Sequence, residues 1–483
     1  MGLLRICCFT LAVIAVIGAK ADEPIGNVKT VFKDVAIIGG GASGSYSAVR
    51  LREDYGVSVV LIEKDVRLGG HVNTWDDPVT GRSFDAGVQS YVDLANSTGF
   101  FARMGVATQP NVRNANQAIN VDFTTGLKLQ NYMAPSAADR NESLYRYLAA
   151  AEQFLPILEP GWWTFPGGDA IPPDLMLPFH AFTAKYNFTA GLPQIFGTTG
   201  FGVPDLVNSP TLWVMRSFNV DMVRTVLNLI AGFVPSSRRN QDLYDKILTF
   251  LGHDVFLSTT VTSSVRSRNT ITLTVKNSIT GETTRIVAKR LLFTIPPTSE
   301  NTNPFGLDAA EKETLGQFKY STSYVGIVSH PALPRDSALI NIPSAAQPTN
   351  YASAIPKAPF MARFDNYANS PYYRVMAAGD SSLTETQAKG VVTDAFERMV
   401  EAGTLNKTEP AEALKFEYFQ GHGMLNAYVT DKELRDGFMA RLNGLQGRGG
   451  MWYTGAAWSV HITTSLWVFT DTVLPRLVRD LKE

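Results

Sequence analysis

Cysteine and histidine are scarce in this sequence, and their scarcity excludes several kinds of site. The 483 residues include six histidines and only two cysteines, Cys7 and Cys8. Both cysteines lie in an N-terminal segment that we expect to be removed, so the mature chain would have no disulfide. No group of histidines has the spacing of metal ligands, so we expect no metal site. A Gly-x-Ser-x-Gly sequence, typical of one class of serine hydrolases, is also missing.

An excess of charge of either sign is absent as well. The chain has 43 basic and 44 acidic residues, for a formal net charge of −1. Because nucleic acids and anionic membrane surfaces attract strongly basic proteins, we expect neither as a partner. Hydrophobic residues make up 45% of the chain, which is enough to bury a large core, and the length exceeds that of one simple domain.

The first 21 residues have the order of a secretory signal peptide. Arg5 supplies positive charge, residues 6–17 form an apolar core, and Ala19-Lys20-Ala21 is a small-x-small cleavage site. The apolar core is too short for a stable membrane span. We therefore predict cleavage near Ala21 and a protein that is secreted or lies in the lumen of the secretory pathway. An uncleaved anchor is the alternative.

Four acceptor sequences for N-glycosylation fit the secretory route. In each, an asparagine is followed two positions later by serine or threonine. Together with the signal peptide they predict a glycoprotein, modified at Asn96, Asn141, Asn187 and Asn406.

A glycine-rich turn after an apolar run is the strongest signal in the sequence. Residues 35–38 predict a buried parallel strand, and Gly39-x-Gly41-x-x-Gly44 follows directly. In a strand–turn–helix unit the first glycine permits a sharp turn, and the second lets a pyrophosphate approach the backbone. The third glycine lets the helix pack closely on the strand. The turn therefore predicts a dinucleotide site.

The following residues complete this unit. A segment from Ser43 to about Tyr55 has helical spacing, and its N-terminus would face the phosphates with free N–H groups. Residues 57–62 predict a second strand, which ends at Glu63, about 20 residues after Gly44. Glu63 can accept hydrogen bonds from an adenosine ribose, and its charge would repel the 2′-phosphate of NADP.

Residues 63–71, with the sequence EKDVRLGGH, resemble the second-strand signature of the flavin amine oxidase superfamily. The resemblance makes FAD a better candidate than NAD, and it implies a cofactor role for Glu63, Lys64, Gly69, Gly70 and His71. It also implies an α/β fold with a Rossmann-type FAD-binding domain built from discontinuous segments, beside an α+β substrate-binding domain. We expect the first domain to comprise residues 30–100, 240–298 and 416–483, and the second 101–239 and 299–415.

Two later segments also resemble the superfamily. Val261 lies where members contact adenine through backbone atoms. Residues 451–459 resemble the terminal element, in which a strand leads to the flavin ring and a helix N-terminus points at its pyrimidine edge. The resemblance thus implies that Gly455, Ala456 and Trp458 lie at the cofactor, where a helix dipole stabilises the anionic reduced flavin. Without a mature cysteine, no cysteinyl flavin is expected.

Three positions depart from the pattern of common amine oxidases. His71 stands where arginine is usual; it can still face a phosphate, and flavin attachment through it is a less favoured alternative. The strand expected at 323–328 has no lysine, although many amine oxidases place a lysine near flavin N5 there, and Lys319 only precedes it. Ala457 stands where many members have an acid. These departures count against an ordinary amine oxidase.

The catalytic residues are not determined by the sequence. His422, Tyr428 and His461 lie in segments expected near the flavin, and each is a candidate catalytic residue. Packing, or a satisfied polar group, explains each of them equally well. His422 is the most suggestive, because a loop histidine between Gly421 and Gly423 is poorly explained by core packing.

The whole pattern is most similar to the β-cyclopiazonate dehydrogenase type of flavin oxidoreductase, fungal enzymes that tailor secondary metabolites. From this resemblance we expect hydride removal from an allylic or amine-adjacent C–H of a hydrophobic small molecule. Cyclisation can follow, and dioxygen would reoxidise the flavin. The alternatives are an amine or amino-acid oxidase, a flavin-dependent isomerase of polyenoic fatty acids, and a flavin-binding protein without catalysis.

Overall fold

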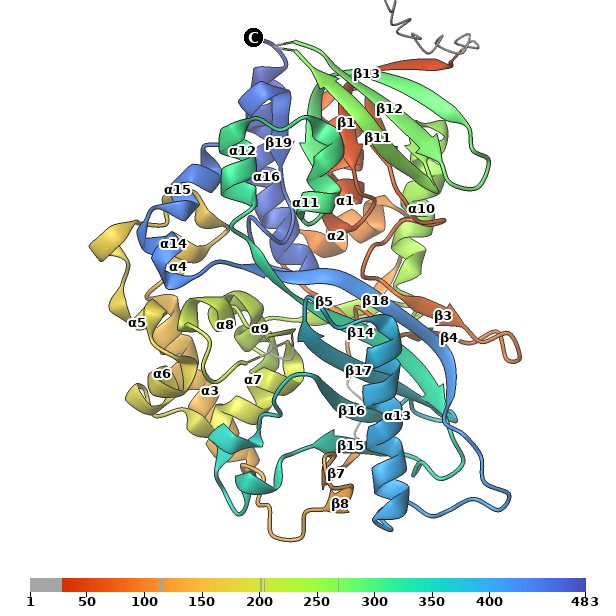
Figure 1. The fold of residues 1–483 in the computed structure, drawn as a ribbon, viewed down its shortest axis with the longest axis vertical. Coiled ribbons are helices and arrows are strands. Elements are labelled where there is room, and N and C mark those ends of the chain that lie inside the picture. The colour runs from red at the N-terminus through yellow and green to blue at the C-terminus, as the bar shows by residue number, and fades with distance from the viewer. Residues whose placement is uncertain (1–27, 113–115, 200–201, 204, 268) are drawn as a thin grey trace, which may run out of the picture.

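Two seven-stranded sheets organise the chain, in the upper and lower halves of Figure 1. The computed structural model describes residues 28–112, 116–199, 202–203, 205–267 and 269–483. The predicted signal peptide, with Cys7 and Cys8, lies outside the described residues. The α/β architecture expected from the sequence is confirmed.

The first sheet contains the strands that the glycine-rich motif predicted. Its order is β10-β2-β1-β13-β12-β11, and β19 also pairs with β13. Strands β10, β2, β1, β13 and β19 are parallel, and β11 and β12 are antiparallel to their neighbours. The bounds are β1 Thr30–Ile38, β2 Val59–Ile62, β10 Val255–Phe256, β11 Thr259–Arg266, β12 Ile271–Asn277, β13 Thr283–Phe293 and β19 Met451–Tyr453.

Helices pack on the central strands of this sheet because those strands are apolar on both faces. Val35, Ala36 and Ile37 of β1 are fully buried. Tyr46 of α1 stacks on Trp467 of α16 with ring centroids 4.9 Å apart, which fixes the two helices together. The helices of this half are α1 Ala42–Tyr55, α2 Ser97–Arg103, α10 Gln241–Leu251, α11 Ser299–Thr302, α12 Ala309–Leu315, α14 Asp431–Arg435, α15 Phe438–Asn443 and α16 Thr463–Asp480, with the short helices η5 Gly252–Asp254, η6 Asn303–Phe305 and η9 Arg448–Gly450.

The second sheet has the order β18-β14-β17-β16-β15-β7-β8. Helix α13 (Glu385–Glu401) covers one face (Figure 1). Side chains of β17 alternate between two cores, since Val375 and Ala377 pack in the cluster with α13, and Met376 and Ala378 in the larger one. The bounds are β7 Gln117–Asp122, β8 Leu127–Lys128, β14 Lys319–Ser329, β15 Ser337–Asn341, β16 Phe360–Asn366, β17 Tyr372–Asp380 and β18 Lys415–Tyr428.

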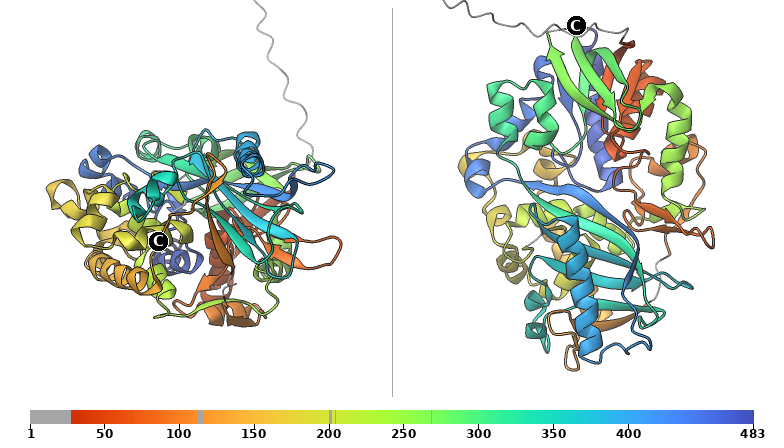
Figure 2. Two further views of the ribbon diagram at one scale, coloured as in Figure 1. Left: turned by 90° about the horizontal axis from the view of Figure 1, so that it is seen from below. Right: turned by 45° about the vertical axis from the view of Figure 1, so that its right-hand side comes forward.

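A group of helices between residues 137 and 226 lies beside the second sheet (Figures 1 and 2). Many of its aromatic side chains are buried in the main core. The helices are α3 Ala137–Glu152, α4 Leu155–Leu158, α5 Pro173–Met176, α6 Phe179–Lys185, α7 Leu192–Thr198, α8 Thr211–Ser217 and α9 Val220–Val226, with η1 Trp162–Thr164, η2 Gly168–Ala170 and η3 Thr189–Gly191; η7 Ser344–Ala346 and η8 Tyr351–Ala354 lie nearby in the chain's later part.

Two regions do not follow the predicted domain boundaries. Strand β18 pairs with β14, so residues 416–428 lie in the second sheet and not with the FAD-binding segment to which we assigned them. A small sheet of β5 (Tyr91–Val92), β9 (Gly232–Pro235) and β6 (Thr108–Pro110) also joins strands across the boundaries expected near 100 and 240. The pairing partner of a strand is decided by contacts distant in sequence, which local patterns do not report. A further hairpin joins β3 (Thr74–Asp76) and β4 (Ser83–Asp85).

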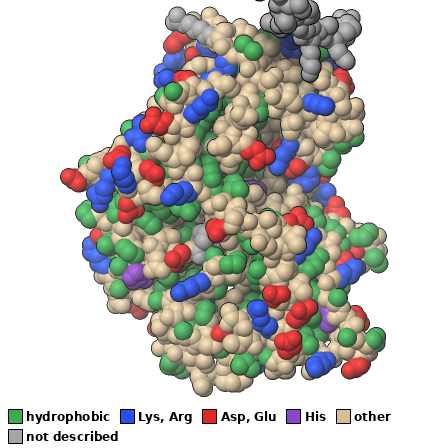
Figure 3. All heavy atoms as spheres, viewed as in Figure 1, with side chains coloured by type: hydrophobic (Ala, Val, Ile, Leu, Met, Phe, Trp, Pro, Cys, Tyr) green, Lys and Arg blue, Asp and Glu red, His purple; other side chains and the backbone are tan. Residues whose placement is uncertain are grey.

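Acidic and basic side chains are interspersed over the face shown in Figure 3. All four predicted glycosylation acceptors, Asn96, Asn141, Asn187 and Asn406, have exposed side chains. In the part of the chain that the structure describes, no helix combines the length and the hydropathy needed to cross a membrane.

Candidate active site

The turn between β1 and α1 exposes backbone where the sequence predicts a pyrophosphate. Gly39 has φ of +100°, and a Cβ on Gly44 would lie 1.8 Å from the Gly39 carbonyl oxygen. Helix α1 begins at Ala42, and within residues 28–112 no side chain caps its N-terminus and no acid lies in its first turn. Its first N–H groups, with the positive end of the helix dipole, are thus available to an anion.

Glu63 follows β2 and lies beside this turn. Its Oε2 accepts a hydrogen bond from the Gly40 amide at 2.5 Å, and its Oε1 accepts one from the Asp65 amide at 2.9 Å. Burial raises the pKa of this carboxyl. The Thr259 amide donates to the Glu63 carbonyl at 2.8 Å, which brings the start of β11, and with it Val261, next to Glu63. The side chain of Lys64 is exposed.

The second glycine pair lies against the first turn. Gly69 and Gly70 have φ of +123° and +54°, and a Cβ on Gly70 would lie 3.0 Å from the Gly41 Cα. The Gly69 amide donates to the Gly40 carbonyl at 2.9 Å. The glycine backbones of the two turns therefore lie next to each other, without side chains between them.

The terminal element starts at β19 and runs beside β13. The Thr454 amide donates to the Phe293 carbonyl at 3.1 Å, and Gly455 has φ of +112°. Residues 456–458 form a turn that leads toward α16, which starts at Thr463. Ala456 is partly exposed in that turn. The indole of Trp458 is buried and stacks on Tyr453 with ring centroids 4.8 Å apart.

Buried polar atoms without partners mark both ends of this site. Among the described residues, Ser43 Oγ at the start of α1 has no hydrogen-bond partner. The same holds at the terminal element for Trp458 Nε1, His461 Nδ1 and Thr464 Oγ1. Buried polar atoms are normally bonded, so these four indicate a missing polar partner. The bare glycine turns and these atoms fit an extended dinucleotide such as FAD.

His71 and His422 are in contact beside the cofactor turns, and His461 lies near enough for its charge to affect the pKa of His422. His71 Nε2 donates to the His422 carbonyl at 2.8 Å, and the two rings stack with centroids 4.5 Å apart. His422 Nε2 lies 2.8 Å from the side-chain amide of Asn73. Burial lowers the pKa of His71, His422 and His461, in the last case to about 3. At neutral pH these rings are therefore uncharged, and His71 does not offer a phosphate a full positive charge.

Strand β14 has hydroxyl groups where many amine oxidases have a lysine. Lys319 is exposed at the first position of the strand, opposite Tyr428. Ser323 is fully buried, and its Oγ has no partner among the described residues. No lysine of β14 is thus in a position to act in the interior.

A cavity of about 490 Å³ lies between α8, the end of β18 and the start of α14. Its wall includes Tyr428, whose pKa is raised by burial, whereas His422 and His461 do not line it. Asp205, Asp431 and Lys432 are exposed at its mouth. The buried lining side chains include Val203, Trp213, Arg216, Asn426 and Val429.

Arg216 connects this cavity with the terminal element. Its Nε donates to the Ser459 carbonyl at 2.7 Å, and its terminal nitrogens donate to the carbonyls of Ala427 and Ala456. Sequence reasoning missed this residue. The available signal was an arginine inside the largely apolar segment TLWVMRS of α8, which offers no polar face that would expose the arginine to solvent.

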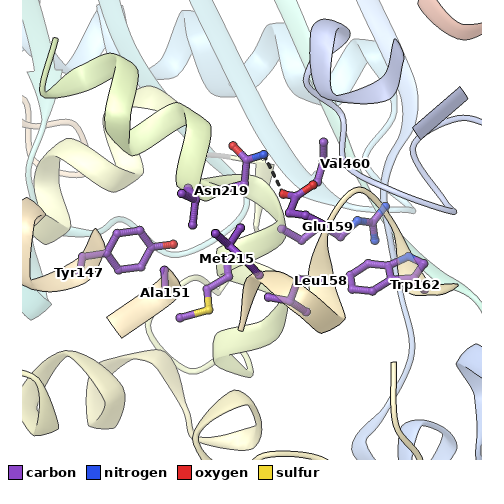
Figure 4. A pocket seen from close by; sticks show the side chains of 11 residues that line it. Tyr147, Ala151, Leu158, Glu159, Trp162, Met215, Asn219 and Val460 are labelled. Carbon is purple, nitrogen blue, oxygen red and sulfur yellow. Dashed lines mark hydrogen bonds between the residues drawn. The ribbon is translucent and has the colours of Figure 1, made fainter. Parts of the chain in front are cut away.

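A smaller cavity of about 20 Å³ lies on the other side of Arg216 and contains a buried carboxyl (Figure 4). Asn219 Nδ2 donates to Glu159 Oε1 at 3.0 Å, and it lies 3.3 Å from Ser465 Oγ of α16. Burial raises the pKa of Glu159 to about 7. In the described ranges, no three His, Cys, Asp or Glu side chains are grouped so as to hold a metal ion.

Comparison with known proteins identifies the group to which this chain belongs. Residues 37–104 match a family model described as an NAD(P)-binding Rossmann-like domain. The FAD-dependent oxidoreductase pigF of Monascus ruber is 30% identical over 454 residues, which cover 93% of each chain. The β-cyclopiazonate dehydrogenase of Aspergillus flavus is 29% identical over 450 residues, with the same coverage.

Solved structures show the same fold. A CLA-producing fatty acid isomerase from P. acnes has a TM-score of 0.69 and 16% identity, over 92% of this chain and 98% of that one. Putrescine oxidase bound to putrescine has a TM-score of 0.60 and 16% identity, over 93% of this chain and 100% of that one. The chain therefore belongs to the family of FAD-dependent oxidoreductases that includes pigF, and β-cyclopiazonate dehydrogenase is a similar protein.

Proposed function

We propose that this chain is a secreted enzyme that removes a hydride from an activated C–H, allylic or next to nitrogen, of a hydrophobic small molecule. The observation that carries the proposal is the 490 Å³ cavity, whose inner wall is joined through Arg216 to the turn at Ala456. The names of the relatives, which include dehydrogenases, support an oxidation of this kind and a role in tailoring a secondary metabolite.

The chain's own residues bind and orient the substrate and the cofactor. The turns at Gly41 and Gly70 and the N-terminus of α1 would hold the pyrophosphate, and Glu63 would hold the ribose. Val203, Trp213 and Val429 would bury the apolar body of the substrate and exclude water. FAD, when bound, supplies the hydride acceptor.

No protein base is required in this reaction. The substrate C–H breaks, the hydride with its electron pair leaves the carbon, and a cation or iminium remains. That cation is quenched by loss of a proton to solvent, or by attack of an internal nucleophile that closes a ring and releases its own proton. Dioxygen then takes the two electrons and two protons and leaves as hydrogen peroxide. The neutral imidazoles of His71 and His422 and the hydroxyl of Ser323 agree with a site that lacks a strong base.

Two other reactions have support from similar structures. The similarity to a fatty acid isomerase favours movement of a double bond in a polyene, in which the hydride returns to the substrate and nothing is oxidised overall. The similarity to putrescine oxidase favours oxidation of an amine, but β14 places no lysine in the interior. We therefore rank the isomerase above the amine oxidase as the second candidate.

An anaerobic titration distinguishes these reactions. The purified protein is mixed with amines, polyenes and prenylated aromatic compounds while the flavin absorbance is followed. The proposed reaction predicts bleaching by one compound class and recovery when oxygen is admitted, with hydrogen peroxide as product. Turnover of a polyene without bleaching would establish the isomerase. Bleaching by simple amines alone would establish the amine oxidase.

Secretion is tested separately from the chemistry. We expect the protein expressed in a eukaryotic host to appear in the medium, with a new N-terminus near residue 22 and with glycans at the four exposed asparagines. Glycosidase treatment should lower its apparent mass, and Asn→Gln at 96, 141, 187 and 406 should lower it stepwise. A protein that stays in the cytosol without glycans would contradict this part of the proposal.

A further inference from the structure

Arg216 carries a buried positive charge that no carboxylate neutralises. Its side chain is 4% exposed, and within the described ranges no Asp or Glu oxygen lies within 4.0 Å of its nitrogens. Its partners are three backbone carbonyls and the rings of Trp162 and Trp213, whose centroids lie 5.9 and 5.7 Å from the guanidinium carbon. A buried charge is costly unless an opposite charge accompanies it, and partial charges on carbonyls and rings compensate only in part.

Glu159 does not pair with this charge. It lines the small cavity that Arg216 also lines, but its carboxyl is bonded to Asn219, and no Glu159 oxygen lies within 4.0 Å of the guanidinium nitrogens. Burial raises the pKa of Glu159 to about 7, so about half of it is protonated at pH 7. Burial lowers the pKa of Arg216 to about 9, which leaves the guanidinium charged at that pH.

The guanidinium still has unused hydrogen-bond donors, and Arg216 lines the large cavity. A guanidinium has five N–H donors, and contacts with described residues use three of them. Arg216 lines the inner part of the 490 Å³ cavity, with Trp213 and Asn426 beside it. At the mouth, the two acids Asp205 and Asp431 outnumber Lys432, so the mouth does not attract an anion and any preference for one must come from the buried arginine.

We propose that Arg216 anchors the anionic group of a hydrophobic organic acid in this cavity, so that the substrates are carboxylic acids. This inference rests on the proposed function in one respect, namely that the occupant of the cavity is the substrate. Two free N–H groups on a planar fork suit the two oxygens of a carboxylate. The apolar lining holds the body of the molecule, with its anionic end at Arg216.

The wild-type holoenzyme tests the anchor without any mutation. Dodecanoate and 4-phenylbutyrate are each titrated against their methyl esters by calorimetry at pH 7.5. We expect each acid to bind about 10- to 100-fold more tightly than its ester, the range for a hydrogen bond to a charged group. The preference should vanish near pH 4, where the acids are protonated. Equal affinity of acid and ester at pH 7.5 would overturn the proposal.

Variants assign the preference to this side chain. Arg216→Met should bring the acid-to-ester ratio to about 1 while ester affinity is kept, and Arg216→Lys should retain part of the preference. Arg435→Met is the matched control, because Arg435 is an exposed arginine of nearby α14 that does not line the cavity. Its ratio should equal that of the wild type. A full preference in a folded Arg216→Met protein would contradict the anchor, and if that variant does not fold, the wild-type comparison decides.

Failure of the anchor and failure of the proposed function give different results. Preferential binding of acids without flavin reduction by any compound would support Arg216 as the anchor and contradict the proposed oxidation. Flavin reduction by neutral polyenes or amines, with no preference for acids, would contradict the anchor and support the oxidation.

Discussion

The cofactor site and the substrate cavity are built from different parts of the chain. The cofactor site consists mainly of backbone atoms of three short turns near Gly41, Gly70 and Gly455. The glycines of the first two turns lie within 32 residues of one another in the sequence. At the cavity, side chains from α8, from the end of β18 and from the start of α14 meet, and Trp213 lies more than 200 residues from Tyr428.

This difference explains why one site is visible in the sequence and the other is not. A turn that must accept a pyrophosphate requires glycine at defined positions, because a Cβ on Gly44 or Gly70 would lie 1.8 or 3.0 Å from backbone atoms. A cavity only requires side chains of suitable size and polarity, and many combinations satisfy that. Substitutions in each region test this difference.

The largest effect should come from Gly44→Ala. The added Cβ would lie 1.8 Å from the Gly39 carbonyl, so the turn and the helix must separate. We expect FAD content to fall by about 100-fold, equivalent to about 2.7 kcal/mol, measured as the ratio of flavin to protein absorbance. Gly390→Ala is the control, since its Cβ would meet nothing within 4 Å in the middle of α13. Full FAD content in Gly44→Ala would show that the cofactor turn does not require glycine at this position.

Glu63→Gln should weaken FAD binding by about 10-fold or more, because it removes a charged acceptor worth about 1.5–3 kcal/mol. The Gly40 amide would lose its charged partner as well. Fluorescence titration of the apoprotein with FAD measures the change, and Glu53→Gln, at an exposed position of α1, is the control. An unchanged dissociation constant would mean that the ribose does not lie at Glu63.

The histidine cluster should make the protein acid-sensitive. His461 has a folded pKa of about 3 against about 6.5 unfolded, so its neutral form stabilises the fold fully above pH 6.5. That contribution is lost as pH falls, by about 2 kcal/mol at pH 5. His461→Asn should therefore flatten the fall in unfolding free energy between pH 7.5 and 5, measured with urea. An equal slope in both proteins would show that His461 titrates normally.

The cavity carboxyl should have the opposite and smaller pH dependence. Glu159 has a folded pKa of about 7 against about 4.5 unfolded, so its protonated form is favoured and stability is lost as pH rises between these values. Glu159→Gln should stabilise the protein by about 1–2 kcal/mol at pH 8.5 and little at pH 5. Destabilisation of equal size at both pH values would show that the carboxyl stays ionised and bonded.

Prediction from the sequence was good where the signal was local. The strand, glycine turn, helix and second strand of residues 30–63 are present with Glu63 beside the turn, and FAD as the cofactor agrees with the relatives. The contacts before the last helix could not be read from the sequence: Arg216 donates to the carbonyls of Ala456 and Ser459, and Trp458 is buried in the core. No local pattern reports an arginine that arrives from α8.

By itself, the amino-acid sequence determined the dinucleotide turn and the α/β unit around it, because these depend on glycine positions and apolar runs that lie close together in the chain, and the choice of FAD followed from a resemblance to known flavoproteins at residues 63–71. Only the tertiary structure decided that β18 joins the second sheet, that His71, His422 and His461 lie close together, and that Arg216 is buried between two cavities. Those features depend on residues that lie tens to hundreds of positions apart, and their proximity is a consequence of packing and not of any local pattern.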